Sequence, residues 1–278
     1  MTRSLLPLAG LILLCTASTL RAQSPTESAH DLVKDVVYNE LQERRQVSLW
    51  QYRVDKRVGN QNTIEQEVET VAGSVSRVLE RQGKPLDAAA QKKETDRLNN
   101  LVHNPGEQAR MKLDHEAEEK RLERLMGAMP DAFLYTYDGA DDGNLRLSFQ
   151  PNPAYNPPTY ETRVYHALSG KIWIQPQQKR LVKIDAHILN EIDFGYGLFG
   201  RIEKGGRFQI AREQVAENRW KTNMLNVHIS GRVVFFKSIN RDQDVKRSAF
   251  KPLPSNISVK DAVDLLKEAP GRLDGGHS

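Results

Sequence analysis

The segment from His115 to Glu119 contains residue types that can bind zinc. It reads His-Glu-Ala-Glu-Glu and begins like a helical zinc-protease motif, in which two histidines one turn apart hold the metal on one helix face. The position of the second histidine is occupied by Glu119. We therefore predict a solvated helix here rather than a metal site.

The segment from Asp138 to Asn144 resembles a calcium-binding loop, because Gly143 is its sixth residue. Ala140 offers no side-chain oxygen at the third position, and Phe149 stands where a bidentate acidic side chain is required. We predict a polar loop between two strands, with a weak ion site as the alternative. The sequence accordingly predicts no bound metal and no cofactor.

Catalytic motifs with a local signature do not occur in the chain. It has no Gly-x-Ser-x-Gly elbow, no phosphate-binding loop and no dinucleotide glycine fingerprint. His166, His187 and His228 lie in segments with strand periodicity, beside Asp, Lys, Asn or Ser rather than in a cluster. We therefore predict a noncatalytic protein.

Apolar residues alternate with glycines from Phe194 to Gly200, which reads Phe-Gly-Tyr-Gly-Leu-Phe-Gly. Repeated glycine in a strand region is typical of a bulge, a bend or a close backbone approach. One interpretation is a sheet corner whose aromatic residues belong to the core. The other is a curved strand whose large side chains line the mouth of an apolar pocket.

The N-terminus has the pattern of a cleavable signal peptide. Arg3 supplies a positive charge, the apolar run from Leu5 to Leu14 follows, and Ala22 provides a small residue at the expected cut. The run is too short to span a membrane. We predict cleavage after Ala22 and a periplasmic or secreted mature chain, with an acylated Cys15 as the alternative.

The mature chain is nearly neutral and contains no cysteine. Loss of Arg3 and Arg21 with the signal lowers the formal charge from +4 to +2, and basic and acidic residues are interleaved. This pattern argues against nucleic-acid binding. Because disulfides are unavailable, stability must come from a packed core, and we predict a single domain over residues 23–278.

Periodicity in the first half predicts helices around two strands. Apolar residues recur at helical spacing from Leu32 to a helix end near Arg45. Alternation predicts a strand at Trp50–Val54, and a partner strand from about Ile64 to Leu79. Between Asp87 and Met129 the composition predicts two helices joined at Asn104-Pro105-Gly106.

The second half predicts an antiparallel meander, because tight-turn residues separate short alternating segments. Such turns are expected at Ser169-Gly170, Pro176-Gln177-Gln178, Gly205-Gly206 and Glu217-Asn218. A capped terminal helix is expected after Ser258. The predicted strands are Phe133–Tyr137, Leu145–Phe149, Arg163–Leu168, Lys171–Gln175, Arg180–Ile188, Phe208–Val215, Trp220–Ile229 and Arg232–Ile239.

This order of elements, in a signal-bearing chain without disulfides, resembles the lipoprotein-localisation-factor superfamily of periplasmic lipoprotein carriers, their outer-membrane receptor and sigma-factor-regulatory relatives. Gly-Lys-Ile-Trp-Ile at Gly170–Ile174, followed by Arg-Leu-Val-Lys-Ile at Arg180–Ile184, is similar to a strand pair of outer-membrane lipoprotein-sorting-like proteins. The stretch from Phe194 to Gly206 and the sequence at Ile229–Arg232 continue the similarity.

The resemblance implies an α+β fold in which a strongly curved antiparallel sheet, a half-barrel, encloses apolar space and is covered by helices. The charged insertion at residues 87–129 departs from the family pattern. We expect it to be a larger helical lid or a partner-binding arm.

We therefore predict a noncatalytic periplasmic carrier or sensor that binds a lipid, lipoprotein acyl chains or another hydrophobic ligand. An interaction module in envelope-stress signalling, which presents a surface to an envelope protein partner, is the alternative. An envelope hydrolase with a site assembled across loops is the second alternative. The expected ligand-binding residues are large apolar groups on or beside the sheet and on the lid helix: Trp50, Tyr52, Trp173, Phe194, Tyr196, Leu198, Phe199, Leu122, Leu125, Met126 and Met129.

Overall fold

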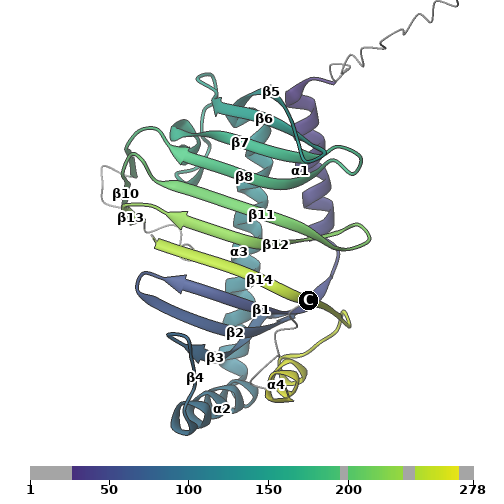
Figure 1. Ribbon diagram of the computed structural model, residues 1–278, viewed down its shortest axis with the longest axis vertical. Helices are drawn as coiled ribbons and strands as arrows, with labels where there is room; N and C mark the ends of the chain where they lie inside the picture. The colour runs from purple at the N-terminus through teal and green to yellow at the C-terminus, as the bar shows by residue number, and fades with distance from the viewer. Residues whose placement is uncertain (1–26, 195–199, 234–241, 269–278) are drawn as a thin grey trace, which may run out of the picture.

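The computed structural model describes residues 27–194, 200–233 and 242–268, which form an α+β fold around one large antiparallel sheet (Figure 1). The sheet has eleven strands and is not closed into a barrel. In spatial order they are β4 (Lys84–Pro85), β3 (Gly73–Arg81), β2 (Gln61–Thr70), β1 (Leu49–Val58), β14 (Asp242–Leu253), β12 (Arg219–His228), β11 (Arg207–Ala216), β8 (Arg180–Ile188), β7 (Leu168–Gln175), β6 (Asn144–Pro151) and β5 (Phe133–Asp141).

A second, three-stranded sheet lies at one end of these strands. It consists of β9 (Ile192–Phe194), β10 (Gly200–Ile202) and β13 (Gly231–Val233). A Cβ atom on Gly231 would lie 2.1 Å from the carbonyl oxygen of Arg201, so this strand pair requires a glycine. The predicted bend at Phe194–Gly200 falls here, but residues 195–199 lie outside the described residues.

Capping residues define where the helices begin. Ser28 accepts a hydrogen bond from the Asp31 N–H at 3.0 Å, and Asn104 accepts one from the Glu107 N–H at 3.0 Å, with Pro105 opening the helix. The described helices are α1 (Ala29–Arg44), α2 (Ala88–Val102), α3 (Pro105–Ala132), the 3-10 helix η1 (Glu161–Ala167) and α4 (Val259–Glu268).

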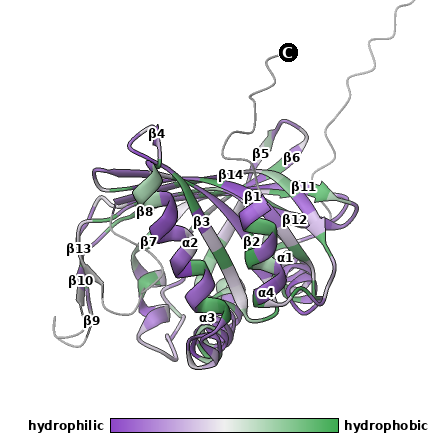
Figure 2. Ribbon diagram, turned by 90° about the horizontal axis from the view of Figure 1, so that it is seen from below, coloured by the Kyte–Doolittle hydropathy of each residue, from purple (hydrophilic) through white to green (hydrophobic). Residues whose placement is uncertain are grey.

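One face of the large sheet carries a continuous apolar row. Residues directly opposite one another across β6, β7, β8, β11, β12 and β14 are Leu147, Ile172, Ile184, Ile210, Leu225 and Val245. Helices α1 and α3 pack on this face, and both lie beneath the sheet in Figure 2. Their apolar residues and those of β5–β8 form the main buried core.

The β2–β3 end of the sheet has a core of its own. Val68 and Val75 pack there against Leu98 of α2 and against Val263 and Leu266 of α4. Val68 pairs with Gln51, which alternates with Tyr52 along β1. Helices α2 and α4 therefore cover the face opposite to that of Tyr52.

Most predicted elements are confirmed, but two are wrong. The predicted strand at Arg163–Leu168 is η1, because Val164, Tyr165 and Ala167 are buried at a helical spacing. The predicted single strand from Ile64 to Leu79 is two strands, β2 and β3. Their turn contains β-branched residues and is closed by Thr70, whose hydroxyl bonds the Ala72 N–H and the Gly73 carbonyl.

One strand of the large sheet was not predicted, and one predicted turn is wrong. Strand β14 was not predicted, although it joins β1 to β12 and so connects the two halves of the sheet. The predicted turn at Ser169-Gly170 lies inside β7. The predicted strand Arg232–Ile239 begins in β13, and its part from residue 234 onward lies outside the described residues.

Gly170 is required by packing rather than by a turn. A Cβ atom at this position would lie 2.1 Å from the carbonyl oxygen of Asp185 on the neighbouring strand. We expect Gly170→Ala to lower the free energy of unfolding by about 1–3 kcal/mol, since β7 and β8 must separate to accept the methyl group. Ser169→Ala is the control, with an expected change within about 0.5 kcal/mol. Equal urea midpoints for the two variants would contradict this explanation.

Candidate functional site

The lid residues predicted from the sequence face the main core. Leu125, Met126 and Met129 of α3 are half-buried and pack against the core cluster that contains the β5–β8 residues. Leu122 is also half-buried but is not part of that cluster. The C-terminal third of α3 therefore supplies the apolar surface that covers the sheet.

Trp50 and Tyr52 lie on the same sheet face as α3, in a neighbouring cluster with Val54 and Val245. Val245 of β14 pairs with Lys56 of β1, so their side chains lie on one face. Trp50 and Tyr52 are an even number of residues from Lys56 along β1, and their side chains therefore lie on the same face as Val245. Both aromatic side chains are buried, with 3% and 5% of their surface exposed. They extend the apolar face beyond the core beneath α1.

Trp173 lies on the opposite face, so the prediction that groups it with Trp50 and Tyr52 is wrong in its geometry. Ile172 and Ile174 turn inward to the core, and the alternation of β7 turns Trp173 outward. The Lys183 ammonium lies 4.4 Å from the Trp173 ring centroid, and the indole Nε1 donates to Asp141 at 3.0 Å. The inward isoleucines were the sequence signal for this orientation.

The remaining predicted residues belong to the glycine-rich segment. Phe194 ends β9, where its backbone pairs with Gly200. Tyr196, Leu198 and Phe199 lie outside the described residues.

Aromatic residues fill the space beneath the C-terminal end of α3. Phe133 packs against Phe149 and Tyr165, with ring centroids 4.8 and 5.0 Å apart. The hydroxyl groups of Tyr135 and Tyr165 donate to the carbonyls of Met129 and Leu125 at 2.9 and 2.7 Å. Burial raises the pKa of both tyrosines, so these hydroxyls stay protonated and keep donating.

Helix α3 runs between the two ends of the sheet (Figure 1). Its C-terminal end packs on α1, η1 and β5, and its N-terminal end packs on α2 and β3, where Met111 and His115 lie beside Gly73. Arg44 of α1 and Glu119 of α3 form an ion pair at 2.7 Å. The helix is thus held at both ends and tied to α1 between them.

A buried charge cluster fixes the C-terminal half of α1 to the sheet. The Arg180 guanidinium donates through Nε and Nη2 to the two Glu40 oxygens at 3.0 Å each. Glu40 also accepts from the Leu181 N–H at 3.0 Å and pairs with Arg212. Burial favours the neutral acid, but Arg212 and Arg180 outweigh it and lower the Glu40 pKa.

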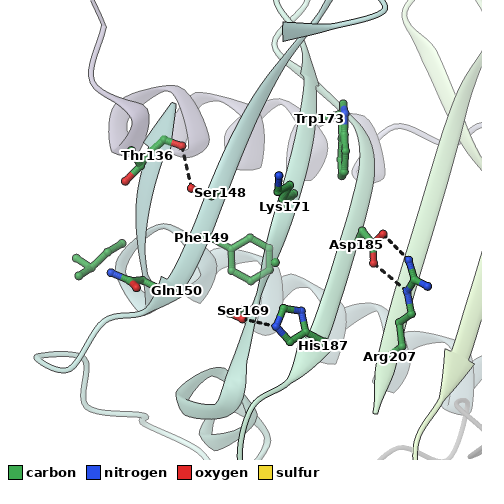
Figure 3. A pocket seen from close by; sticks show the side chains of 12 residues that line it. Thr136, Ser148, Phe149, Gln150, Ser169, Lys171, Trp173, Asp185, His187 and Arg207 are labelled. Carbon is green, nitrogen blue, oxygen red and sulfur yellow. Dashed lines mark hydrogen bonds and ion pairs between the residues drawn. The ribbon is translucent and has the colours of Figure 1, made fainter. Parts of the chain in front are cut away.

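The sheet face opposite to α1 and α3 contains an open hollow of about 650 Å³, bordered by β5, β6, β7, β8 and β11 and away from the β2–β3 end that α2 and α4 cover (Figure 3). Within it the Ser169 hydroxyl lies 3.0 Å from His187 Nε2. The Asp185 carboxylate is held by Arg207 at 3.1 and 2.8 Å and by Gln209 at 2.9 Å. A hollow of about 790 Å³ lies elsewhere, beside the C-terminal half of α1.

The Ser169–His187 contact is a cross-strand pair of nucleophile and base, but the described residues around it do not complete a hydrolytic site. Asp185 is engaged by Arg207 and Gln209 rather than orienting the imidazole. The strands that carry the pair, β7 and β8, are paired antiparallel through this region, so their main-chain groups serve the sheet rather than an oxyanion.

Among the described residues, no group of three or more histidine, cysteine, aspartate or glutamate side chains is placed to hold a metal ion. The Asp138 carboxylate, first in the calcium-like segment, pairs with Lys171 and Arg146. No described helix is long and apolar enough to cross a membrane. Compared with protein-family models, curated proteins and solved structures, the chain matches none of them.

Proposed function

We propose that the protein is a noncatalytic carrier that holds a hydrophobic ligand, such as a lipid or the acyl chains of a lipoprotein, between one sheet face and helices α1 and α3. The observation that carries the proposal is the apolar row that crosses β6, β7, β8, β11, β12 and β14 on one sheet face. Its members on β6, β7, β8 and β11 pack in one cluster with residues of α1 and α3. Apolar sheet faces under separable helices suit ligands that are themselves apolar.

In this proposal the sheet is a half-barrel and residues 87–129 are its lid. Leu125, Met126 and Met129 give α3 an apolar patch near its C-terminal end, whereas most of its N-terminal half is exposed. Methionine side chains adapt to partners of different shape, so this patch can cover either the sheet or an acyl chain. In this proposal, the packed apolar core between α3 and the sheet represents the closed, ligand-free form of the protein.

The two covering helices are attached differently, which supports α3 as the part that moves. The Glu40–Arg180 cluster fixes α1 through buried ionic hydrogen bonds. Helix α3 ends beside β5, and Pro130 in its last turn cannot donate a main-chain hydrogen bond to the Met126 carbonyl. A rotation about this end would part α3 from the sheet while α1 stays in place, and it would break the exposed Arg44–Glu119 ion pair and the contacts of the N-terminal end of α3 with α2 and β3.

Saturable binding of a fluorescent fatty acid tests the proposal directly. We expect one binding site per chain and enhanced probe fluorescence in an apolar environment. Competition by an unlabelled fatty acid is the control. A probe that fails to saturate, or that is not displaced, would contradict the carrier function.

An interaction module for an envelope partner is the second candidate. It is favoured by the tight packing of the core, in which Leu147 and Ile174 have no exposed surface. A permanently closed core would leave only outer surfaces for function. The behaviour of a charged substitution at Met126, described in the Discussion, separates the two candidates.

We also propose that the chain is exported and loses its first 22 residues. Expressed with its own N-terminus in a Gram-negative host, the mature protein is expected in the periplasmic fraction, beginning near Gln23. N-terminal sequencing checks the position of the cut. An intact Met1 or an acylated Cys15 would contradict this part of the proposal.

A further inference from the structure

The open hollow over β5–β8 and β11, on the sheet face opposite to α1 and α3, has the size of a ligand site. Its volume of about 650 Å³ falls within the range of about 300–1,000 Å³ typical of such sites. Hydroxyl and amide side chains from β5, β6 and β7 line it, namely Thr136, Ser148, Gln150 and Ser169 (Figure 3). These groups can both donate and accept hydrogen bonds.

Asp185, Arg207 and Lys171, charged side chains that line the hollow, each form an ion pair. Asp185 accepts two hydrogen bonds from Arg207, at 3.1 and 2.8 Å. The Lys171 ammonium lies 2.7 Å from the Asp138 carboxylate. A charged ligand would have to compete with these ion pairs, whereas a neutral polar ligand can use the hydrogen-bonding capacity that they leave.

Trp173 gives the polar hollow an apolar surface whose orientation is fixed. Its indole Nε1 donates to Asp141 at 3.0 Å, and the Lys183 ammonium lies 4.4 Å from the ring centroid. These two contacts hold the orientation of the ring, which borders the hollow. A half-buried aromatic ring beside hydroxyl, amide and carboxylate groups matches a ligand with apolar C–H faces and a polar rim.

We propose that this hollow binds a neutral oligosaccharide, with a sugar ring against the face of Trp173 that Lys183 does not cover and its hydroxyl groups bonded to side chains such as Gln150 and Asp185. The site lies on the opposite sheet face from the apolar row, because Trp173 alternates with Ile172 along β7. It is therefore independent of the proposed carrier function, and either can fail without the other.

Isothermal titration calorimetry with maltotetraose, cellotetraose and the tetramer of N-acetylglucosamine tests the proposal. We expect at least one of them to bind with a Kd of about 1 mM or below. Trp173→Ala should weaken that binding at least about tenfold, and Trp173→Phe should weaken it less. Ser248→Ala, which lies on the same sheet face outside the hollow, should bind like the parent chain.

Circular dichroism checks that each variant is folded. We expect the Trp173 variants to fold, because Trp173 is only half-buried and lies on the sheet surface. Absence of saturable binding to all three tetrasaccharides would overturn the proposal. So would an unchanged affinity in folded Trp173→Ala. Binding that high salt abolishes would also overturn it, since it would show recognition of charge rather than of hydroxyl groups.

Discussion

Replacing Glu40 by alanine should lower the free energy of unfolding by about 1–3 kcal/mol, because it removes one of the two carboxylates, Glu40 and Glu43, that pair with the buried Arg180 and Arg212 guanidinium groups. Glu40 and Arg180 are 3% and 6% exposed, and Arg212 pairs with the same carboxylate. Urea denaturation followed by circular dichroism measures the loss. Asp264→Ala, which breaks the exposed Lys260–Asp264 pair, is the matched control and should cost less than about 1 kcal/mol. Similar losses in both variants would contradict a structural role for the cluster.

The same cluster predicts how stability responds to acid. Burial disfavours the Glu40 carboxylate, but Arg212 and Arg180 hold its pKa in the folded protein below the ordinary value. The stabilisation is therefore complete above the ordinary glutamate pKa of about 4.3 and is lost as the pH falls through the folded-state pKa. Glu40→Gln should flatten this part of the profile of unfolding free energy against pH. A profile parallel to that of the parent protein would show that Glu40 does not carry this linkage.

Replacing Met126 by glutamate should abolish fatty-acid uptake while changing the free energy of unfolding by less than about 1 kcal/mol. In the carrier account, the half-buried patch around Met126 faces a cavity that opens. The new carboxylate can then be solvated by water, and it disrupts only the apolar surface that would contact the ligand. In a permanently dry core, the same substitution should cost several kcal/mol, since an unpaired charge would be buried. Thermal unfolding and fluorescent fatty-acid binding are measured on the same variant.

Leu113→Glu provides the matched control for this experiment. Leu113 lies on the same helix but is 66% exposed, so both stability and uptake should remain as in the parent chain. A severe loss of stability in Met126→Glu, together with no binding by the parent protein, would reject the carrier and favour the interaction module.

Local signals were sufficient to predict most helices and hairpins. Asn104-Pro105-Gly106 separates α2 from α3 because the Asn104 side chain caps α3 and Pro105 opens it. The turn at Glu217-Asn218 lies between β11 and β12, with Asn218 at positive φ. In both cases a few adjacent residues determine the local backbone conformation, so the helix start and the turn can be predicted without knowledge of the tertiary structure.

Long-range pairings could not be read in the same way. Glu40 falls on the apolar stripe of α1, seven residues after Val33, which signals a buried acid, but its partner Arg180 is 140 residues away. Strand β14 likewise pairs with β1 across most of the chain. The outward orientation of Trp173 was available from its isoleucine neighbours, but its place in a polar hollow depends on β6 and β8. Such sites are assembled by the sheet rather than by one segment.

Lipid extraction and mass spectrometry of the protein purified from the periplasm, without added ligand, test the central claim most directly. The carrier account predicts an acyl lipid bound at about one molecule per chain, and its displacement when a fluorescent fatty acid is added. Met126→Glu, purified in the same way, should carry much less lipid, and Leu113→Glu should carry the parental amount. A parent protein that is free of acyl lipid and binds no fluorescent fatty acid would contradict the account.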